Sequence, residues 1–179
     1  MKTLILKAEK SMGKDNIILI GMPWSGKSTI GVLLAKALKR QFIDTDLLIQ
    51  TRTGKSLQEI IDTEGVDNFK TIEENLILTL NPQNAVIATG GSVVYSDKAM
   101  HHLIFIGYLI YLKCSYETIL NRAQFVELRG LVKTKSDQSL LELYNERCPL
   151  YEKYADIIID CDNLKHEEIV QKIISSIKL

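Results

Sequence analysis

The sequence predicts a three-layer α/β domain built on a mainly parallel five-stranded sheet. Five short apolar runs alternate with longer segments of helical periodicity, an order typical of parallel sheets covered by helices. The first of these runs leads directly into a glycine-containing turn and then into a helix. The length of 179 residues fits one such domain, which is large enough to bury its own core.

Composition narrows the possible functions. Lys plus Arg and Asp plus Glu both number 22, and the resulting net charge of zero argues against general binding of nucleic acid. No apolar run reaches transmembrane length, and no signal peptide is visible. Cys114, Cys148 and Cys161 lack the spacing of a zinc site or a disulfide framework and indicate reduced thiols. We therefore expect a cytoplasmic monomer with neither nucleic-acid nor membrane partners.

Residues 1–15 precede the first predicted strand of the domain. Residues 7–15 are polar and contain Gly13, which predicts a loop, and residues 4–6 could form a short edge strand. We interpret residues 1–15 as an N-terminal extension and residues 16–179 as a single domain.

Residues 17–30 carry the strongest functional signal. Four aliphatic residues, 17–20, are typical of a buried central strand. Gly21, Gly26, Lys27 and Ser28 then follow in the spacing G-x-x-x-x-G-K-[ST]. The glycines let successive N–H groups turn toward an anion, and the following helix adds its free N–H groups and its dipole. Lys27 can reach the β- and γ-phosphates of a nucleotide, and the Ser28 hydroxyl can bind Mg²⁺. The stretch therefore predicts a phosphate-binding loop.

The next two strands each end in residues suited to a ligand site. Residues 42–43 predict the second strand, with Asp44 and Asp46 at its carboxyl end, where ligands bind in open parallel sheets. On extended backbone these two carboxylates would face the same side; the alternative is a turn in which an Asp caps a helix. Residues 85–88 predict the third strand, and Gly90 and Gly91 after it permit close backbone approach to a ligand.

Periodicity and capping signals predict the remaining elements. We expect helices at 27–40, 47–53, 56–64, 69–80, 97–104, 116–123, 139–154 and 166–177, and strands at 108–112 and 157–159. The adjacent His101 and His102 point in different directions and are interpreted as surface residues rather than metal ligands. Residues 125–137, which include Arg129, lack periodicity and predict a mobile flap; the alternative is an ordinary exposed loop.

From Asn16 to the C-terminus the chain resembles the shikimate kinases, a family of P-loop kinases related to the nucleoside monophosphate kinases. Seven segments carry the resemblance through their order and spacing: residues 21–29, 42–46, 54–65, 69–73, 88–92, 129–131 and 147–151. The resemblance implies a parallel sheet of order 2-3-1-4-5 with a mobile lid at about residues 125–137. It also implies ATP-dependent phosphorylation of shikimate at the 3-hydroxyl, with Mg²⁺ as cofactor.

The resemblance implies a role for each matching residue. The ATP phosphates would be bound by Gly21, Ser25, Gly26, Lys27, Ser28 and Thr29, and the adenine by Arg122. Mg²⁺ would be bound by Ser28 directly and by Asp44 through water. Asp46 would bind the substrate hydroxyls and assist proton removal. The shikimate pocket would be lined by Lys70, Gly90, Gly91 and Arg147, with Lys70 and Arg147 at the carboxylate, and Arg129 would close on the phosphates.

Three positions depart from the family pattern. Lys70 replaces the usual arginine, Ser92 the third glycine of a usual triple, and Gly130 the proline of the lid. Lysine keeps the charge but loses the fork that matches a carboxylate, and Ser92 adds a hydroxyl to the pocket wall. Two alternatives therefore stay open: a kinase of another hydroxy acid such as gluconate, or a nucleotide-binding regulator without turnover. Asp44, Asp46, Lys27 and Arg129 argue against the regulator, because a binding protein needs neither a base nor a lid arginine.

Overall fold

The structure is a computed structural model that describes residues 15–124 and 138–177. The predicted edge strand at 4–6, nearly all of the N-terminal extension, and the flap at 125–137 with Arg129 lie outside the described residues.

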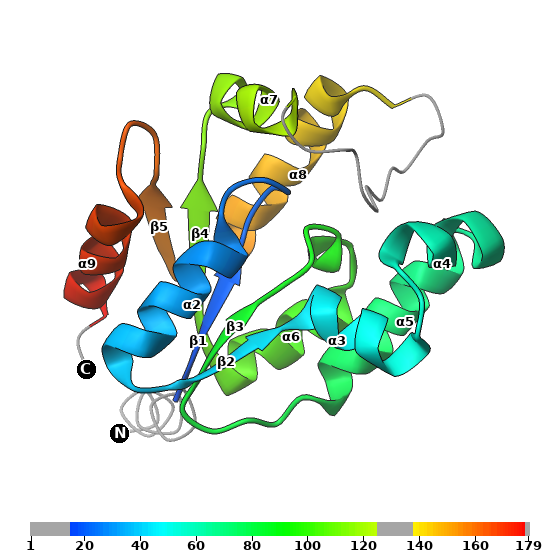
Figure 1. The fold of residues 1–179 in the computed structure, drawn as a ribbon, viewed down its shortest axis with the longest axis horizontal. Helices are drawn as coiled ribbons and strands as arrows, with labels where there is room; N and C mark the ends of the chain where they lie inside the picture. Colours follow the sequence, from blue (N-terminus) through cyan, green and yellow to red (C-terminus); the bar gives the residue numbers. More distant parts are fainter. Residues whose placement is uncertain (1–14, 125–137, 178–179) are drawn as a thin grey trace, which may run out of the picture.

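Five parallel strands form one sheet in the order β2-β3-β1-β4-β5 (Figure 1). The central strand is β1 (Asn16–Ile20), flanked by β3 (Ala85–Ala88) and then β2 (Gln41–Asp44) on one side, and by β4 (Gly107–Lys113) and β5 (Ile157–Asp160) on the other. Every residue of β1 and β3 is buried, which explains their nearly continuous apolar sequences. The predicted fold class and strand order are confirmed.

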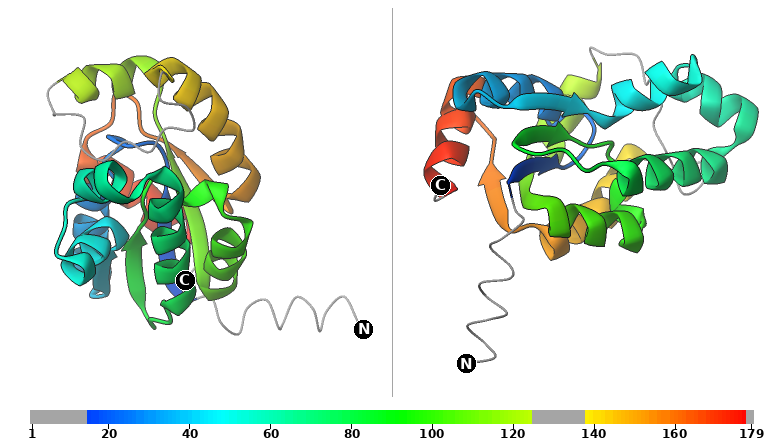
Figure 2. Two further views of the ribbon diagram at one scale, coloured as in Figure 1. Left: turned by 90° about the vertical axis from the view of Figure 1, so that its right-hand side faces the viewer. Right: turned by 90° about the horizontal axis from the view of Figure 1, so that it is seen from below.

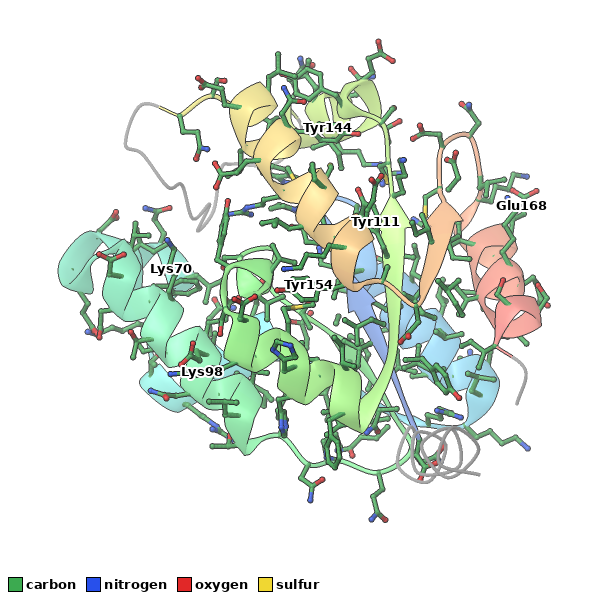
Figure 3. All side chains as sticks on the ribbon, turned by 180° about the vertical axis from the view of Figure 1, so that it is seen from behind. Lys70, Lys98, Tyr111, Tyr144, Tyr154 and Glu168 are labelled. Carbon is green, nitrogen blue, oxygen red and sulfur yellow. The ribbon has the colours of Figure 1, made fainter. Side chains whose placement is uncertain are left out.

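Helices cover both faces of the sheet, as the view from below in Figure 2 shows. On one face α2 (Lys27–Leu38) packs beside α9 (His166–Ser176); on the other lie α6 (Asp97–Ile106) and α8 (Leu140–Tyr154), both in contact with β4. Tyr111 of β4 points toward α8 and stacks on Tyr151, with ring centroids 5.2 Å apart (Figure 3). The short α7 (Tyr116–Gln124) follows β4 and contacts α8.

Three helices lie together beyond the β2 edge of the sheet (Figure 1). They are α3 (Thr45–Thr53), α4 (Leu57–Glu64) and α5 (Val66–Thr79), and a small core of Ile49, Ile60, Phe69 and Leu76 joins them. Helix α5 also packs against α6. The predicted capping box starts α4, because Ser56 Oγ accepts the N–H of Glu59 and a Glu59 carboxylate oxygen accepts the N–H of Ser56. This group carries Asp46 and Lys70, each of which lines a cavity of the site described below.

Helix α3 begins earlier than predicted. The strand β2 ends at Asp44 and the helix starts at Thr45, so Asp46 lies in the first helical turn. One Asp44 carboxylate oxygen accepts the N–H groups of Asp46 (3.0 Å) and Leu47 (3.2 Å), which caps the helix. The predicted extended backbone at Asp46 is therefore wrong, and the capping alternative is correct, because the free N–H groups of a helix start take up the nearest carboxylate. Both carboxylates still lie close enough to Lys27 to act on its charge.

Other boundaries differ by a few residues. Helix α5 begins at Val66 rather than 69, and α6 continues to Ile106, where β4 follows without a loop. His101 is exposed and His102 half-buried, and each contacts a backbone carbonyl, of Asp97 and Leu80 respectively. Within residues 15–124 and 138–177, no group of three or more His, Cys, Asp or Glu side chains gathers into a metal site.

The strand register brings the predicted site residues to one edge. Ala88 of β3 pairs with Leu19 of β1 on one side and with Asp44 of β2 on the other. Because parallel strands end at the same edge, the phosphate loop, the Asp44 cap and the glycine turn after β3 emerge side by side.

Candidate active site

Residues 21–26 form the loop between β1 and α2. Gly26 has φ +92°, a left-handed conformation that a side chain would strain, and it caps the start of α2 without a side-chain hydrogen bond. The N-terminus of α2 therefore presents free N–H groups at the carboxyl edge of the sheet, an arrangement that binds anions.

The Lys27 side chain lies inside this loop. Its Nζ donates to the carbonyls of Gly21 (2.9 Å) and Met22 (2.8 Å), and the residue is buried. Burial lowers the pKa of Lys27 to about 8, while the nearby carboxylates of Asp46 and Asp44 oppose the shift. The loop thus holds the Lys27 ammonium group beside the place where an anion would bind.

Ser28 and Asp44 meet next to Lys27. The Ser28 hydroxyl donates to Asp44 Oδ2 at 2.7 Å, so a helix start and a strand end, 16 residues apart, place two oxygen atoms together. A hydroxyl and a carboxylate are the hard oxygen ligands that Mg²⁺ prefers when phosphates and water complete its shell.

Asp46 lies deeper in the site. Its Oδ1 atom is buried and has no hydrogen-bond partner among the described residues. Burial and, after it, the charge of Asp44 raise the pKa of Asp46 while Lys27 lowers it, and together they bring this pKa to about 6. The carboxylate is therefore more basic than an ordinary aspartate, which suits a residue that accepts a proton.

Sequence reasoning assigned no role to Glu73. This residue of α5 is 3% exposed, and burial, followed by the charge of Asp46, raises its pKa to about 7. Its Oε2 accepts a 2.7 Å hydrogen bond from the Ser92 hydroxyl, and its Oε1 is the other buried oxygen without a partner among the described residues. The only signal that could have found it was a Glu on an otherwise apolar helix face, one turn after Phe69.

The glycine turn after β3 lets these groups approach. A Cβ on Gly90 would come within 2.3 Å of Glu73 Oε1 and 2.6 Å of Asp46 Oδ1, and a Cβ on Gly91 would lie 3.1 Å from Arg147 Nη1. The Gly90 N–H donates to the buried Thr45 hydroxyl at 3.1 Å, which ties the turn to α3. Both glycines are therefore required for these side chains to lie so close to the turn, and the predicted approach of a ligand to this backbone stays a prediction.

Among the residues that the structure describes, Arg147 is the largest fully buried side chain, at 1% exposure. It extends from α8, and its Nε donates to the Tyr95 hydroxyl at 3.0 Å. Tyr95 ends the 3₁₀ turn η1 (Val93–Tyr95), and the Lys70 ammonium lies 5.2 Å from the centroid of its ring. Lys70 and Arg147 thus both contact the ring of Tyr95, a residue to which the sequence analysis assigned no role, and their joint binding of a carboxylate stays a prediction.

Arg122 lies against the phosphate loop. It extends from α7, and its Nη1 donates to the carbonyl of Trp24 at 3.0 Å. An arginine beside the loop fits the expected contact with adenine, since guanidinium groups stack on aromatic rings.

One cavity of about 290 Å³ unites most of the predicted residues. Its lining includes Lys27, Ser28, Asp46, Gly90, Gly91 and Arg147. Lys70 instead lines an adjoining cavity of about 150 Å³, together with Glu73 and Tyr95, and Ser92 contributes to both cavities.

A phosphate-binding loop, a paired hydroxyl and carboxylate, and a buried basic aspartate in one cavity define a class of protein: a P-loop kinase of a small molecule. The chain belongs to the shikimate kinase family, whose sequence profile, described as Shikimate kinase, matches residues 23–178. This family uses ATP as co-substrate, and the chain is accordingly a phosphotransferase.

Similar proteins support the same family. The shikimate kinase of Clostridium botulinum strain 657 is 40% identical over 167 residues, covering 92% of this chain and 96% of that protein. The shikimate kinase of Thermodesulfovibrio yellowstonii is 39% identical over 161 residues, covering 89% and 92%. The solved structure of shikimate kinase from Acinetobacter baumannii in complex with shikimate is 30% identical, covers 95% of both chains and gives a TM-score of 0.82.

Proposed function

We propose that this enzyme transfers the γ-phosphoryl group of ATP to the 3-hydroxyl of shikimate, forming shikimate 3-phosphate for aromatic amino acid biosynthesis. One observation carries the proposal: a single cavity is lined by Lys27 of the phosphate loop, by Asp46 and by the buried Arg147. The acceptor molecule must therefore bind between a phosphate site and a fixed cation, and a small hydroxylated carboxylate matches both.

Asp46 is the group that we propose to receive the proton of the attacking hydroxyl. Its raised pKa of about 6 leaves it ionised at neutral pH and a better base than an exposed aspartate. Lys27 and the loop N–H groups, contributed by Gly21, Ser25, Gly26, Ser28 and Thr29, would stabilise the charge on the transferring phosphoryl group. We further propose that Arg129, outside the described residues, closes over the phosphates.

The oxygen ligands at the start of α2 fit Mg²⁺. We propose that Ser28 binds the ion directly and that Asp44 binds it through water, since their oxygens already meet at 2.7 Å. When bound, the ion neutralises charge on the β- and γ-phosphate oxygens.

The other end of the cavity would bind the acceptor. We propose that Arg147 and Lys70 attract the carboxylate, that Gly90 and Gly91 allow close approach of the ring, and that Arg122 stacks on the adenine. A guanidinium group held by neighbouring contacts can meet a carboxylate with two parallel hydrogen bonds.

A kinase of another hydroxy acid such as gluconate is the second candidate, and Lys70 is the feature that favours it. The other departure from the family pattern in this region has a structural explanation. The Ser92 hydroxyl is bound to Glu73, so it adds no unpaired polar group to the wall of the cavity.

We propose that the enzyme works as a cytoplasmic monomer. None of the helices within the described residues is both long and apolar enough to cross a membrane. The three cysteines are free thiols, and ATP is a cytoplasmic substrate.

A coupled ADP-release assay over a panel of acceptors tests the proposal. Shikimate, gluconate and an uncharged cyclic polyol should be compared at equal concentration with saturating ATP and Mg²⁺. We expect turnover of shikimate to exceed that of the other two by at least a hundredfold. Faster turnover of gluconate would favour the second candidate, and ADP release with none of the three would overturn the assignment of the acceptor class.

A further inference from the structure

Three elements meet at the ring of Tyr95. The Lys70 ammonium of α5 lies 5.2 Å from its centroid, and the Arg147 guanidinium carbon of α8 lies 5.0 Å from the same centroid. Figure 3 shows Lys70 projecting from the first half of α5. Within the described residues, the Lys70 ammonium lies within 4.0 Å of no carboxylate oxygen, although its charge also acts on the buried Glu73 carboxylate.

The phenol group fixes how Arg147 can present its charge. Its oxygen accepts from Arg147 Nε at 3.0 Å, while its proton is directed to the carboxylate of Glu146. With Nε bound to the phenol, the end of the guanidinium with the two Nη atoms is the edge that can form a paired contact with a carboxylate. That end is directed to the main cavity, because Nη1 lies 3.1 Å from the position of a Cβ on Gly91.

The two cations approach the same ring, at 5.2 Å and 5.0 Å from its centroid, from two adjoining cavities: Lys70 lines the smaller one, Arg147 the larger one, and Ser92 lines both. Two cations near one point repel each other, and the negative face of an aromatic ring offsets part of this repulsion. Their summed field attracts an anion and gives an uncharged ligand no such gain. A residue that gathers two cations in this way therefore selects acids over neutral molecules of the same shape.

We propose that Tyr95 is a specificity-determining residue: it holds Arg147 and Lys70 as one carboxylate site, and so restricts the acceptor to hydroxy acids. This inference rests on the proposed function, because it concerns the acceptor end of the same cavity. The inference adds Tyr95 as a positioning residue that acts through the two cations. It also explains how a lysine can replace the usual arginine at position 70: the contact with the Tyr95 ring orients the lysine, as the forked guanidinium would orient an arginine.

The test compares shikimate with its carboxamide, in which the charge is removed and the ring is kept. Tyr95→Phe removes the hydroxyl, and Tyr95→Leu removes the aromatic face as well. Tyr154→Phe is the matched control, because its hydroxyl bonds to Asp97 at the far end of α8 (Figure 3). Thermal unfolding of each variant establishes that it folds.

We expect Tyr95→Phe to raise the KM for shikimate about tenfold and Tyr95→Leu about a hundredfold, with the KM for ATP within about twofold of wild type. The preference for shikimate over the carboxamide should fall in parallel, and Tyr154→Phe should leave it unchanged. In the Arg147→Ala background, Tyr95→Phe should add little, because the contact through which it acts is already lost. An acid preference in Tyr95→Leu equal to that of wild type would overturn the proposal.

Calorimetric binding of shikimate and its carboxamide, without nucleotide, separates this proposal from the proposed function. Binding of shikimate that depends on Tyr95, in a protein that does not turn it over, would contradict the kinase assignment alone. Turnover of shikimate with an acid preference independent of Tyr95 would contradict the present inference alone. An equal loss of ATP affinity in the Tyr95 variants would also contradict it, because that result indicates general damage to the fold.

Discussion

The Ser92 hydroxyl donates a 2.7 Å hydrogen bond to the buried carboxylate of Glu73, which joins the turn after β3 to helix α5. Both residues are at most 5% exposed, so neither can exchange this partner for bulk water. The bond satisfies one oxygen of Glu73 and leaves the other facing Asp46 across Gly90. A serine where the family pattern has glycine is thus part of the support of the site.

Glu73 should make the protein less stable as pH rises. Its folded-state pKa of about 7 lies above its ordinary value of 4.5, so between these values the unfolded chain loses the proton while the folded chain keeps it. The stabilisation that comes from keeping the proton on Glu73 is complete below pH 4.5 and is lost as pH rises through 7. We expect the free energy of unfolding, measured in urea, to fall more steeply across this range in wild type than in Glu73→Gln, by on the order of 3 kcal/mol. Equal slopes would show that Glu73 is already ionised in the folded protein.

Lys27→Ala should abolish kinase activity while the fold persists. Groups that stabilise charge in a transition state typically contribute about 3–4 kcal/mol, which corresponds to at least about a hundredfold in kcat. Lys36→Ala, an exposed lysine on the same helix, is the matched control for steady-state kinetics. Activity of Lys27→Ala within tenfold of wild type would contradict the assignment of the phosphate loop.

Asp46→Asn and Asp44→Asn should have different effects. Asp46 lines the cavity that we propose to bind the acceptor, so its amide should lower kcat by about a hundredfold or more with little change in ATP affinity. Asp44 binds the Ser28 hydroxyl, so its amide should chiefly raise the Mg²⁺ concentration needed for half-maximal rate. Titration of both variants with Mg²⁺ and ATP measures these effects. If Asp46→Asn instead raised the Mg²⁺ requirement and Asp44→Asn lowered kcat, the roles assigned to the two aspartates would have to be exchanged.

Nucleotide binding should change the fluorescence of Trp24, the single tryptophan of the chain. It lies in the phosphate loop with φ +63°, and its carbonyl accepts from Arg122. Contact of a nucleotide with either group should alter the surroundings of the indole. A titration with ADP and Mg²⁺, read at the tryptophan emission and compared with Trp24→Phe, measures the shift; constant emission at saturation would argue that the loop is not the nucleotide site.

Local sequence signals determined most of the framework. The apolar run at 17–20, the spacing of Gly21, Gly26 and Lys27, and the capping box at Ser56 each act over a few neighbouring residues, and each appears in the structure as predicted. The strand order, by contrast, was predicted only from the family resemblance, because the sequence of one strand does not specify which strand will pair with it. The conformation at Asp46 was the clear error, because a strand and a helix start compete there and the free N–H groups of the helix decided the outcome.

The contacts within the site were decided by the tertiary structure. Ser92 and Glu73 are 19 residues apart, and Arg147 and Tyr95 are 52 apart. Their side chains meet only because parallel strands end at one edge and the helices that follow pack over it. Residue type and spacing therefore specified a phosphate loop and its helix, whereas the burial that raises the pKa of Asp46, and the ring that gathers two cations, exist only once the layers have closed around them.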